Sequence, residues 1–141
     1  MKRKVPTWIY ILIPFLAIAT CNYIINTQDE DERFNQPRVG DYYAFSRLIQ
    51  DEEAAEDQVL KLAEIGPDSM TFFLPMQEFP FGFQISESES VVRDADKNGS
   101  MFSPYIMKVS RADLLKYREN GSLSLGNAMK YDQPKLIKVF R

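Results

Sequence analysis

Histidine is absent from this chain of 141 residues, and cysteine occurs only once. Without histidine, the chain has no Ser-His-Asp or Cys-His catalysis, no histidine-ligated zinc and no imidazole pH switch. A single cysteine excludes an intrachain disulfide. The sequence also lacks a glycine-rich phosphate loop, and no pair of its acidic residues stands out as the carboxylates of a glycoside hydrolase. We therefore expect neither catalysis nor a bound cofactor.

The one long apolar run lies near the amino terminus. The 18 positions from Trp8 to Ile25 carry no charge, and as a helix they would span about 27 Å, close to the hydrocarbon core of a membrane. Basic residues precede the run at 2–4, and acidic residues follow it at 29–32. This pattern predicts a single-pass signal anchor over 1–26, with a cytoplasmic start and an exported (periplasmic or extracellular) remainder. The anchor would contain Trp8, Tyr10, Pro14 and Cys21.

Two other processing outcomes stay open. The residues 17–19, Ala-Ile-Ala, fit the small-x-small rule and would allow signal-peptide cleavage after Ala19. The residues 18–21, Ile-Ala-Thr-Cys, resemble the bacterial lipobox, which implies a lipoprotein cut before Cys21, although Thr20 stands where that box prefers Gly, Ala or Ser. We favour the retained anchor, because the apolar run continues past both cuts.

The rest of the chain predicts a short tether followed by one β-rich domain. Residues 27–37 are polar and acidic and are interpreted as the tether, and the exported domain then covers 38–141. Turn residues and runs of aromatic and β-branched residues predict strands, at 39–45, 58–65, 70–74, 105–109 and 135–141. The second and third of these would form a hairpin, with a helix over 51–65 as the alternative for the second.

A single short helix is expected near 111–119. Ser110 can cap it, Asp113 stands where a capping-box acid belongs, and Gly121 would close it. Strands around one short helix predict an α+β domain in the form of a small, partly open β-barrel. Its Gly-Asp opening at 40–41 resembles SH3-like barrels, a likeness of fold that carries no function.

Charge is distributed unevenly along the chain. The net charge is −7 over 27–57, −5 over 58–96 and +6 over 97–141. We expect the basic last third to pack near the acidic start, and a dipolar surface that steers a charged partner is the alternative. The basic residues carry no nucleic-acid motif and the domain is acidic overall, so we expect no nucleic-acid partner.

Two segments are candidates for binding a protein partner. The acidic stretch 51–57 contains Glu52, Glu53, Glu56 and Asp57, and its simpler interpretation is a solvated acidic face. The segment 79–83 alternates aromatic residues with Pro and Gly, which would place Phe79, Phe81 and Phe83 on one face of an extended chain. Its simpler interpretation is an edge strand that contributes three core residues.

One motif points to a metal. Residues 94–99, Asp-Ala-Asp-Lys-Asn-Gly, match the first six positions of an EF-hand calcium loop, with Asp94, Asp96 and Asn98 as candidate ligands. The match then fails, because Tyr105 stands where the bidentate Glu belongs. We favour a hairpin in which residues 98–99 form the turn between 91–92 and 101–102, without calcium.

These features predict a non-catalytic, membrane-anchored envelope protein. It would act as a binding or accessory subunit of a membrane-associated complex through its exported domain. The alternative is a small acidic immunity or inhibitor protein that binds a toxin or enzyme in the same compartment, with the acidic stretch 51–57 as the plug.

Overall fold

The computed structural model describes residues 9–46, 57–76, 85–122 and 133–141, and the chain divides into two units, Met1–Gln36 and Pro37–Arg141. In the first unit, helix α1 spans Ile9–Asn35 with Pro14 inside it. The helix therefore continues through most of the segment that we interpreted as a tether. Among the described residues, no helix has both the length and the apolar character needed to cross a membrane.

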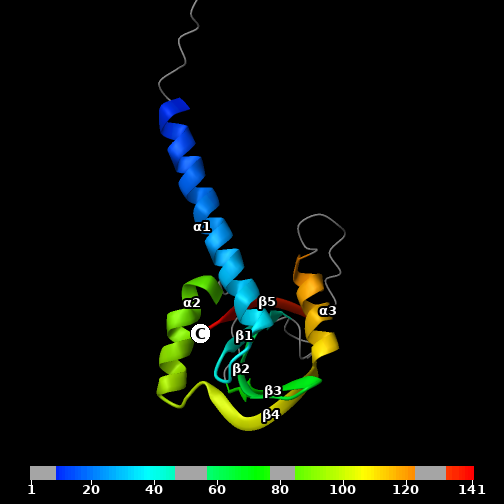
Figure 1. The fold of residues 1–141 in the computed structure, drawn as a ribbon. Helices are drawn as coiled ribbons and strands as arrows, with labels where there is room; N and C mark the ends of the chain where they lie inside the picture. Colours follow the sequence, from blue (N-terminus) through cyan, green and yellow to red (C-terminus); the bar gives the residue numbers. More distant parts are fainter. Residues whose placement is uncertain (1–8, 47–56, 77–84, 123–132) are drawn as a thin grey trace, which may run out of the picture. The chain divides into compact units, whose positions relative to one another are not determined.

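The second unit is a small α+β domain built on one five-stranded antiparallel sheet. Its strands are β1 (Tyr42–Ser46), β2 (Asp57–Ile65), β3 (Ser69–Pro75), β4 (Phe102–Ser110) and β5 (Lys135–Phe140). Their order in the sheet is β4-β3-β2-β1-β5 (Figure 1). Because β4 and β5 lie at opposite edges, the described strands form an open sheet. The predicted barrel closure is therefore not observed.

The hairpin between β2 and β3 confirms the sequence prediction. Leu62 lies opposite Phe72, and the Gly66 amide donates to the Ser69 carbonyl at 2.8 Å across the turn. The helix alternative is wrong for residues 57–65, and residues 51–56 lie outside the described part. Both faces of β2 contribute to the core, since Val59 and Leu60 are each buried. This two-sided burial explains why the strand lacks a clear alternation of polar and apolar residues.

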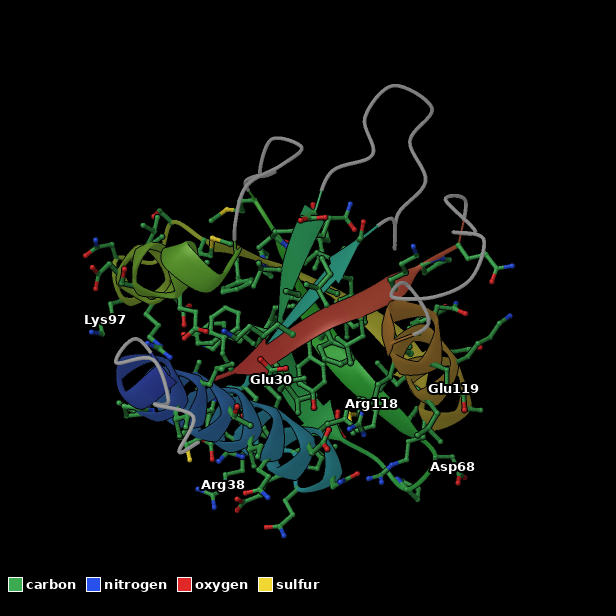
Figure 2. The ribbon with its side chains drawn as sticks, turned by 90° about the horizontal axis from the view of Figure 1, so that it is seen from above. Glu30, Arg38, Asp68, Lys97, Arg118 and Glu119 are labelled. Atoms are coloured by element: carbon green, nitrogen blue, oxygen red, sulfur yellow. The ribbon has the colours of Figure 1, made fainter. Side chains whose placement is uncertain are left out.

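Two helices flank the sheet, α2 (Ile85–Lys97) and α3 (Arg111–Ser122). Val92 of α2 packs in a buried cluster with Tyr42 and Ala44 of β1. Tyr117 of α3 instead meets Phe45 edge-on, with ring centroids 6.3 Å apart. Since side chains alternate between the two faces of a strand, α2 and α3 cover opposite faces of the sheet, as Figures 1 and 2 show.

Helix α2 replaces the first half of the hairpin that we predicted over 91–102, so that prediction is wrong. The Asn98–Gly99 pair ends the helix instead of joining two strands. Gly99 has a φ of 70°, its amide donates to the Asp96 carbonyl at 2.9 Å, and the Ser100 amide donates to the Ala95 carbonyl at 3.0 Å. These two bonds form a Schellman motif, in which glycine takes the left-handed position.

Helix α3 confirms the predicted helix near 111–119 and its capping residues. The Asp113 amide donates to the Ser110 hydroxyl at 3.0 Å, and that hydroxyl donates to the Asp113 carboxylate at 2.6 Å. The helix runs on to Ser122, so Gly121 does not close it as expected. Gly121 serves close packing instead, because a Cβ there would overlap the carbonyl oxygen of Leu136 in β5.

We expect Gly121→Ala to destabilise the domain. The added methyl group must displace the backbone of β5, which we expect to lower the free energy of unfolding by about 1–3 kcal/mol despite the better helix propensity of alanine. Chemical denaturation of both proteins measures the difference. Lys116→Ala, on an exposed part of the same helix, is the control and should change little. If Gly121→Ala unfolds with the same free energy as the wild type, Gly121 does not approach the backbone of β5 as closely as described.

The Tyr43 ring is fully buried, but its hydroxyl has no hydrogen-bond partner among the described residues. Burial raises the pKa of Tyr43 above its usual range, so the group stays neutral. An unpaired buried hydroxyl costs desolvation energy. We therefore expect Tyr43→Phe to leave stability unchanged or to raise it by about 1 kcal/mol, measured as a shift in the thermal midpoint. A clear loss of stability would instead reveal a partner for the hydroxyl.

Candidate functional site

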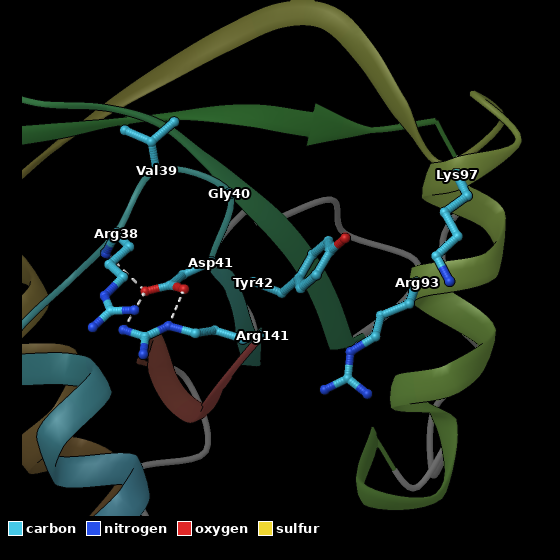
Figure 3. Close-up of a pocket in the computed structure, with 8 residues that line it drawn as sticks. All are labelled: Arg38, Val39, Gly40, Asp41, Tyr42, Arg93, Lys97 and Arg141. Carbon is cyan, nitrogen blue, oxygen red and sulfur yellow. Dashed lines mark hydrogen bonds and ion pairs between the residues drawn. The ribbon is translucent and has the colours of Figure 1, made fainter.

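An open pocket of about 330 Å³ lies at one end of the sheet in the second unit (Figure 3). Three parts of the chain form its walls: the turn before β1, helix α2 and the residue that follows β5. Four of the eight lining residues are cationic and one is acidic. The lining residues are Arg38, Val39, Gly40, Asp41, Tyr42, Arg93, Lys97 and Arg141.

A buried carboxylate organises one wall of the pocket. Asp41 is only 2% exposed, and it accepts hydrogen bonds from the Arg141 Nε at 2.7 Å and from the Arg38 amide at 2.8 Å. Gly40 lies in the turn between Arg38 and Asp41 and has a φ of 95°, a left-handed backbone conformation that glycine adopts readily. The Gly40 amide donates to the Leu62 carbonyl at 2.8 Å, so the turn is fixed to β2.

Helix α2 supplies the opposite wall through Arg93 and Lys97, one helical turn apart. Glu89 binds the Arg93 guanidinium at 3.1 Å and also pairs with Lys138 of β5 at 2.5 Å. The guanidinium lies 5.8 Å from the centre of the Phe140 ring, within the range of a cation–π contact. Its Nε is buried and has no hydrogen-bond partner among the described residues.

The pocket is cationic within an acidic domain. Asp41 is the one carboxylate that lines it, and Arg141 already neutralises this charge. Arg93 and Lys97 pair with carboxylates that do not line the pocket, Glu89 and Asp94, and residues 37–141 as a whole carry a net charge of −3. Arginine and lysine side chains that converge in this way suit an anionic group. The pocket can therefore bind an anion.

Beside the pocket, Tyr42 and Lys61 share one carboxylate oxygen of Asp96, at 2.6 and 2.5 Å. This network fixes α2 to β1 and β2. Burial and the hydrogen bond to Asp96 raise the pKa of Tyr42 to about 12, so its hydroxyl stays protonated at neutral pH. A tyrosine in this state holds structure and does not act as a base.

The candidate calcium ligands do not form a loop. Asp94 and Asp96 lie in the last turn of α2, and Asn98 follows directly in its C-terminal cap. Asp96 is occupied by Tyr42 and Lys61, and Asp94 faces Lys97 at 3.8 Å. Within the described ranges, no three histidine, cysteine, aspartate or glutamate side chains gather as a metal site would require.

Most of the predicted partner-binding residues lie outside the described part of the chain, namely Glu52, Glu53, Glu56, Phe79, Phe81 and Phe83. Asp57 is described and begins β2 at a half-buried position. Burial raises the pKa of Asp57, against a smaller lowering by its hydrogen bond with Ser46. Of the predicted anchor residues, Trp8 lies outside the described part, Tyr10 and Pro14 belong to α1, and Cys21 in that helix is exposed.

Sequence reasoning missed the cationic side chains of the pocket. Arg93 and Lys97 stand four residues apart, which brings their Cβ atoms within about 6 Å of each other on a helix, whereas an extended strand would separate them by about 13 Å. The predicted hairpin over 91–102 gives no reason to expect these two side chains close together. Arg38 and Arg141 stand at opposite ends of the domain in sequence, and only the sheet topology brings them together.

No protein-family model, curated protein or solved structure matches this chain. The chemistry of the pocket is therefore the guide to what the domain does. Cationic donors converge in the pocket, and no described residue that lines it is an activated nucleophile or base.

The stability of the domain should depend on the ionisation of Asp96. Burial alone would raise the pKa of this carboxyl, but the hydrogen bonds from Lys61 and Tyr42 and the charge of Lys61 outweigh it, so the pKa is lowered below 3.8. A lowered pKa in the folded state stabilises the protein above pH 3.8 and loses this effect as the pH falls through the folded value. We expect Asp96→Asn to lower the free energy of unfolding by about 1–2 kcal/mol at pH 7.

The measurement is the free energy of unfolding from denaturant titrations between pH 7 and pH 2.5. The gap between the wild type and Asp96→Asn should narrow below pH 3.8. Asp94→Asn is the matched control on the same helical turn, and its exposed carboxylate should contribute little. A difference in unfolding free energy that does not change with pH would show that the charge of Asp96 does not contribute to stability.

Proposed function

We propose that this chain is a non-catalytic binding protein, a membrane-anchored accessory subunit whose exported domain recognises an anionic group on its partner through the cationic pocket. The observation that carries the proposal is the convergence of four cationic side chains on one pocket of an otherwise acidic domain, namely Arg38, Arg93, Lys97 and Arg141. Ion pairs with Asp41 and Glu89 hold the neighbouring Arg141 and the Arg93 side chain in place. A pocket organised in this way needs little rearrangement to bind.

The membrane anchor is supported by the sequence and by the surface of α1. The 18 positions 8–25 carry no charge, with basic residues before them and acidic residues after them. Ile13, Leu16 and Ile18 are each about 60% exposed on the helix, and exposed apolar side chains of this size call for a covering surface. The Thr20 hydroxyl donates to the Leu16 carbonyl at 2.7 Å, so it is satisfied within the helix.

The test is co-purification of the full-length protein from detergent-solubilised native membranes. A variant with Arg38, Arg93 and Lys97 changed to Gln should lose at least about tenfold of the co-purifying partner, because each loss removes a charge-assisted contact. The control changes Lys108 and Lys116 to Gln, two exposed cations that do not line the pocket. Equal loss in both variants, or in neither, would contradict recognition through the pocket.

The same preparation separates the immunity or inhibitor alternative. That function would place recognition in the acidic stretch, so changing Glu52, Glu53 and Glu56 to Gln would remove the partner while the pocket variant retains it. The intact mass of the purified chain reports processing. The unprocessed mass supports the anchor, a chain that starts at Thr20 shows signal-peptide cleavage, and an acylated chain that starts at Cys21 shows a lipoprotein.

A further inference from the structure

We infer that the anionic group taken by the pocket is a single carboxylate, and that Arg38 is the residue that binds it. This inference rests on the proposed function, since it names the class of anion and the residue that recognises it. It follows from the interactions of the lining cations, from the turn that carries Arg38, and from the size of the pocket.

Arg38 differs from the other three cations that line the pocket. Each of those three pairs with a carboxylate of the domain, namely Arg93 with Glu89, Lys97 with Asp94, and Arg141 with Asp41. The Arg38 side chain is exposed, and within the part of the chain that the structure describes it forms no hydrogen bond or ion pair. Its guanidinium can therefore bind a ligand without first breaking an ion pair of the domain.

One exposed guanidinium suits a ligand with one negative charge. The N–H donors of arginine form a planar fork that matches the two oxygens of a carboxylate. A phosphate monoester carries a charge between about −1.5 and −2 at pH 7. It would require a second cation from the lining, and each of the others already contacts a carboxylate. The pocket therefore favours a carboxylate over a phosphate monoester.

The turn that carries Arg38 is held by three hydrogen bonds. The Arg38 amide donates to the Asp41 carboxylate at 2.8 Å, and the Asp41 amide donates back to the Arg38 carbonyl at 3.0 Å. The Gly40 amide fixes the turn to β2 through the Leu62 carbonyl at 2.8 Å. With the main chain fixed in this way, binding has to order only the Arg38 side chain, which lowers its entropic cost.

The rest of the pocket limits the size of the ligand. Its volume of about 330 Å³ lies near the lower end of the range for ligand pockets, about 300–1,000 Å³, which suits one acidic side chain. Lys97 extends from α2 on the other side of the pocket from Arg38 (Figure 3). Its pair with Asp94 is 3.8 Å long and exposed, and such pairs contribute little, so Lys97 can also attract the carboxylate.

A carboxylate has two possible sources, an acidic side chain of the protein partner and a free organic acid. A carbodiimide tests both, because it joins a carboxylate to a lysine amine in direct contact with it. The full-length protein is treated in detergent-solubilised native membranes. Arg38→Lys places an amine at the binding position, and Arg111→Lys is the matched control, since Arg111 is exposed and does not line the pocket.

Peptide mass spectrometry should find position 38 of the Arg38→Lys variant linked to a carboxylate, with no such link at position 111 of the control. Lys97 lines the same pocket and should give the link in the wild-type protein as well, so the assay does not depend on the substitution alone. A linked partner peptide identifies an acidic side chain as the source. A small added mass identifies a free organic acid, which would keep the carboxylate assignment and contradict recognition of a partner.

A second variant measures the contribution of Arg38. Arg38→Gln alone should reduce the co-purifying partner at least about tenfold, because it removes a charge-assisted hydrogen bond. Arg111→Gln is the control and should leave the partner unchanged. Thermal unfolding of both variants checks that the domain is folded, which we expect because the bond to Asp41 uses the main-chain amide of Arg38.

The outcomes separate this inference from the proposed function. Retention of the partner by Arg38→Gln, with loss in the variant that changes Arg38, Arg93 and Lys97 together, would overturn the role of Arg38 and leave anion recognition intact. Loss in Arg38→Gln without a carboxylate link at position 38 or at Lys97 would overturn the carboxylate assignment. Retention by both variants would overturn the proposed function.

Discussion

The ion pair between Asp41 and Arg141 is the constraint on which the domain depends. It joins residues that are one hundred positions apart, and the Asp41 carboxylate is almost fully buried. A buried carboxylate without a partner is strongly destabilising, so folding requires the end of β5 to lie beside the start of β1. This placement seats Phe140 against Tyr42, with ring centroids 5.1 Å apart, and completes one wall of the cationic pocket.

Two further ion pairs hold α2 against the sheet, and they show how acidic and basic segments of the sequence pair within the domain. Glu89 pairs with Lys138 of β5, and Asp96 pairs with Lys61 of β2. The pair Asp41–Arg141 joins the acidic start of the chain to its basic last third, as the charge distribution predicted, whereas Glu89–Lys138 joins the last third to the middle of the chain. Four cationic side chains line the pocket at one end of the sheet. Arg93 and Arg141 thus take part both in packing within the domain and in the lining of the pocket.

Local signals predicted most of the sheet, because a turn and a run of aromatic or β-branched residues act within a few positions. The hairpin of β2 and β3, the cap at Ser110 and the last strand β5 all follow from such signals. Helix α2 was missed because an Asn-Gly pair ends a helix as readily as it turns a hairpin. The pocket could not be predicted, since Arg38, Arg93 and Arg141 meet only through the order of the strands.

The open sheet also affects whether copies of the domain can pair with one another through their edge strands. Among the described strands, β4 forms one edge of the sheet, and an edge strand can pair with a strand of another molecule. Pro104 has no amide hydrogen to offer, and Lys108 places a charge along the same strand, and both are exposed. Edge strands that carry proline and lysine resist such pairing. Proline and lysine at this edge therefore disfavour association between copies of the domain through their sheets.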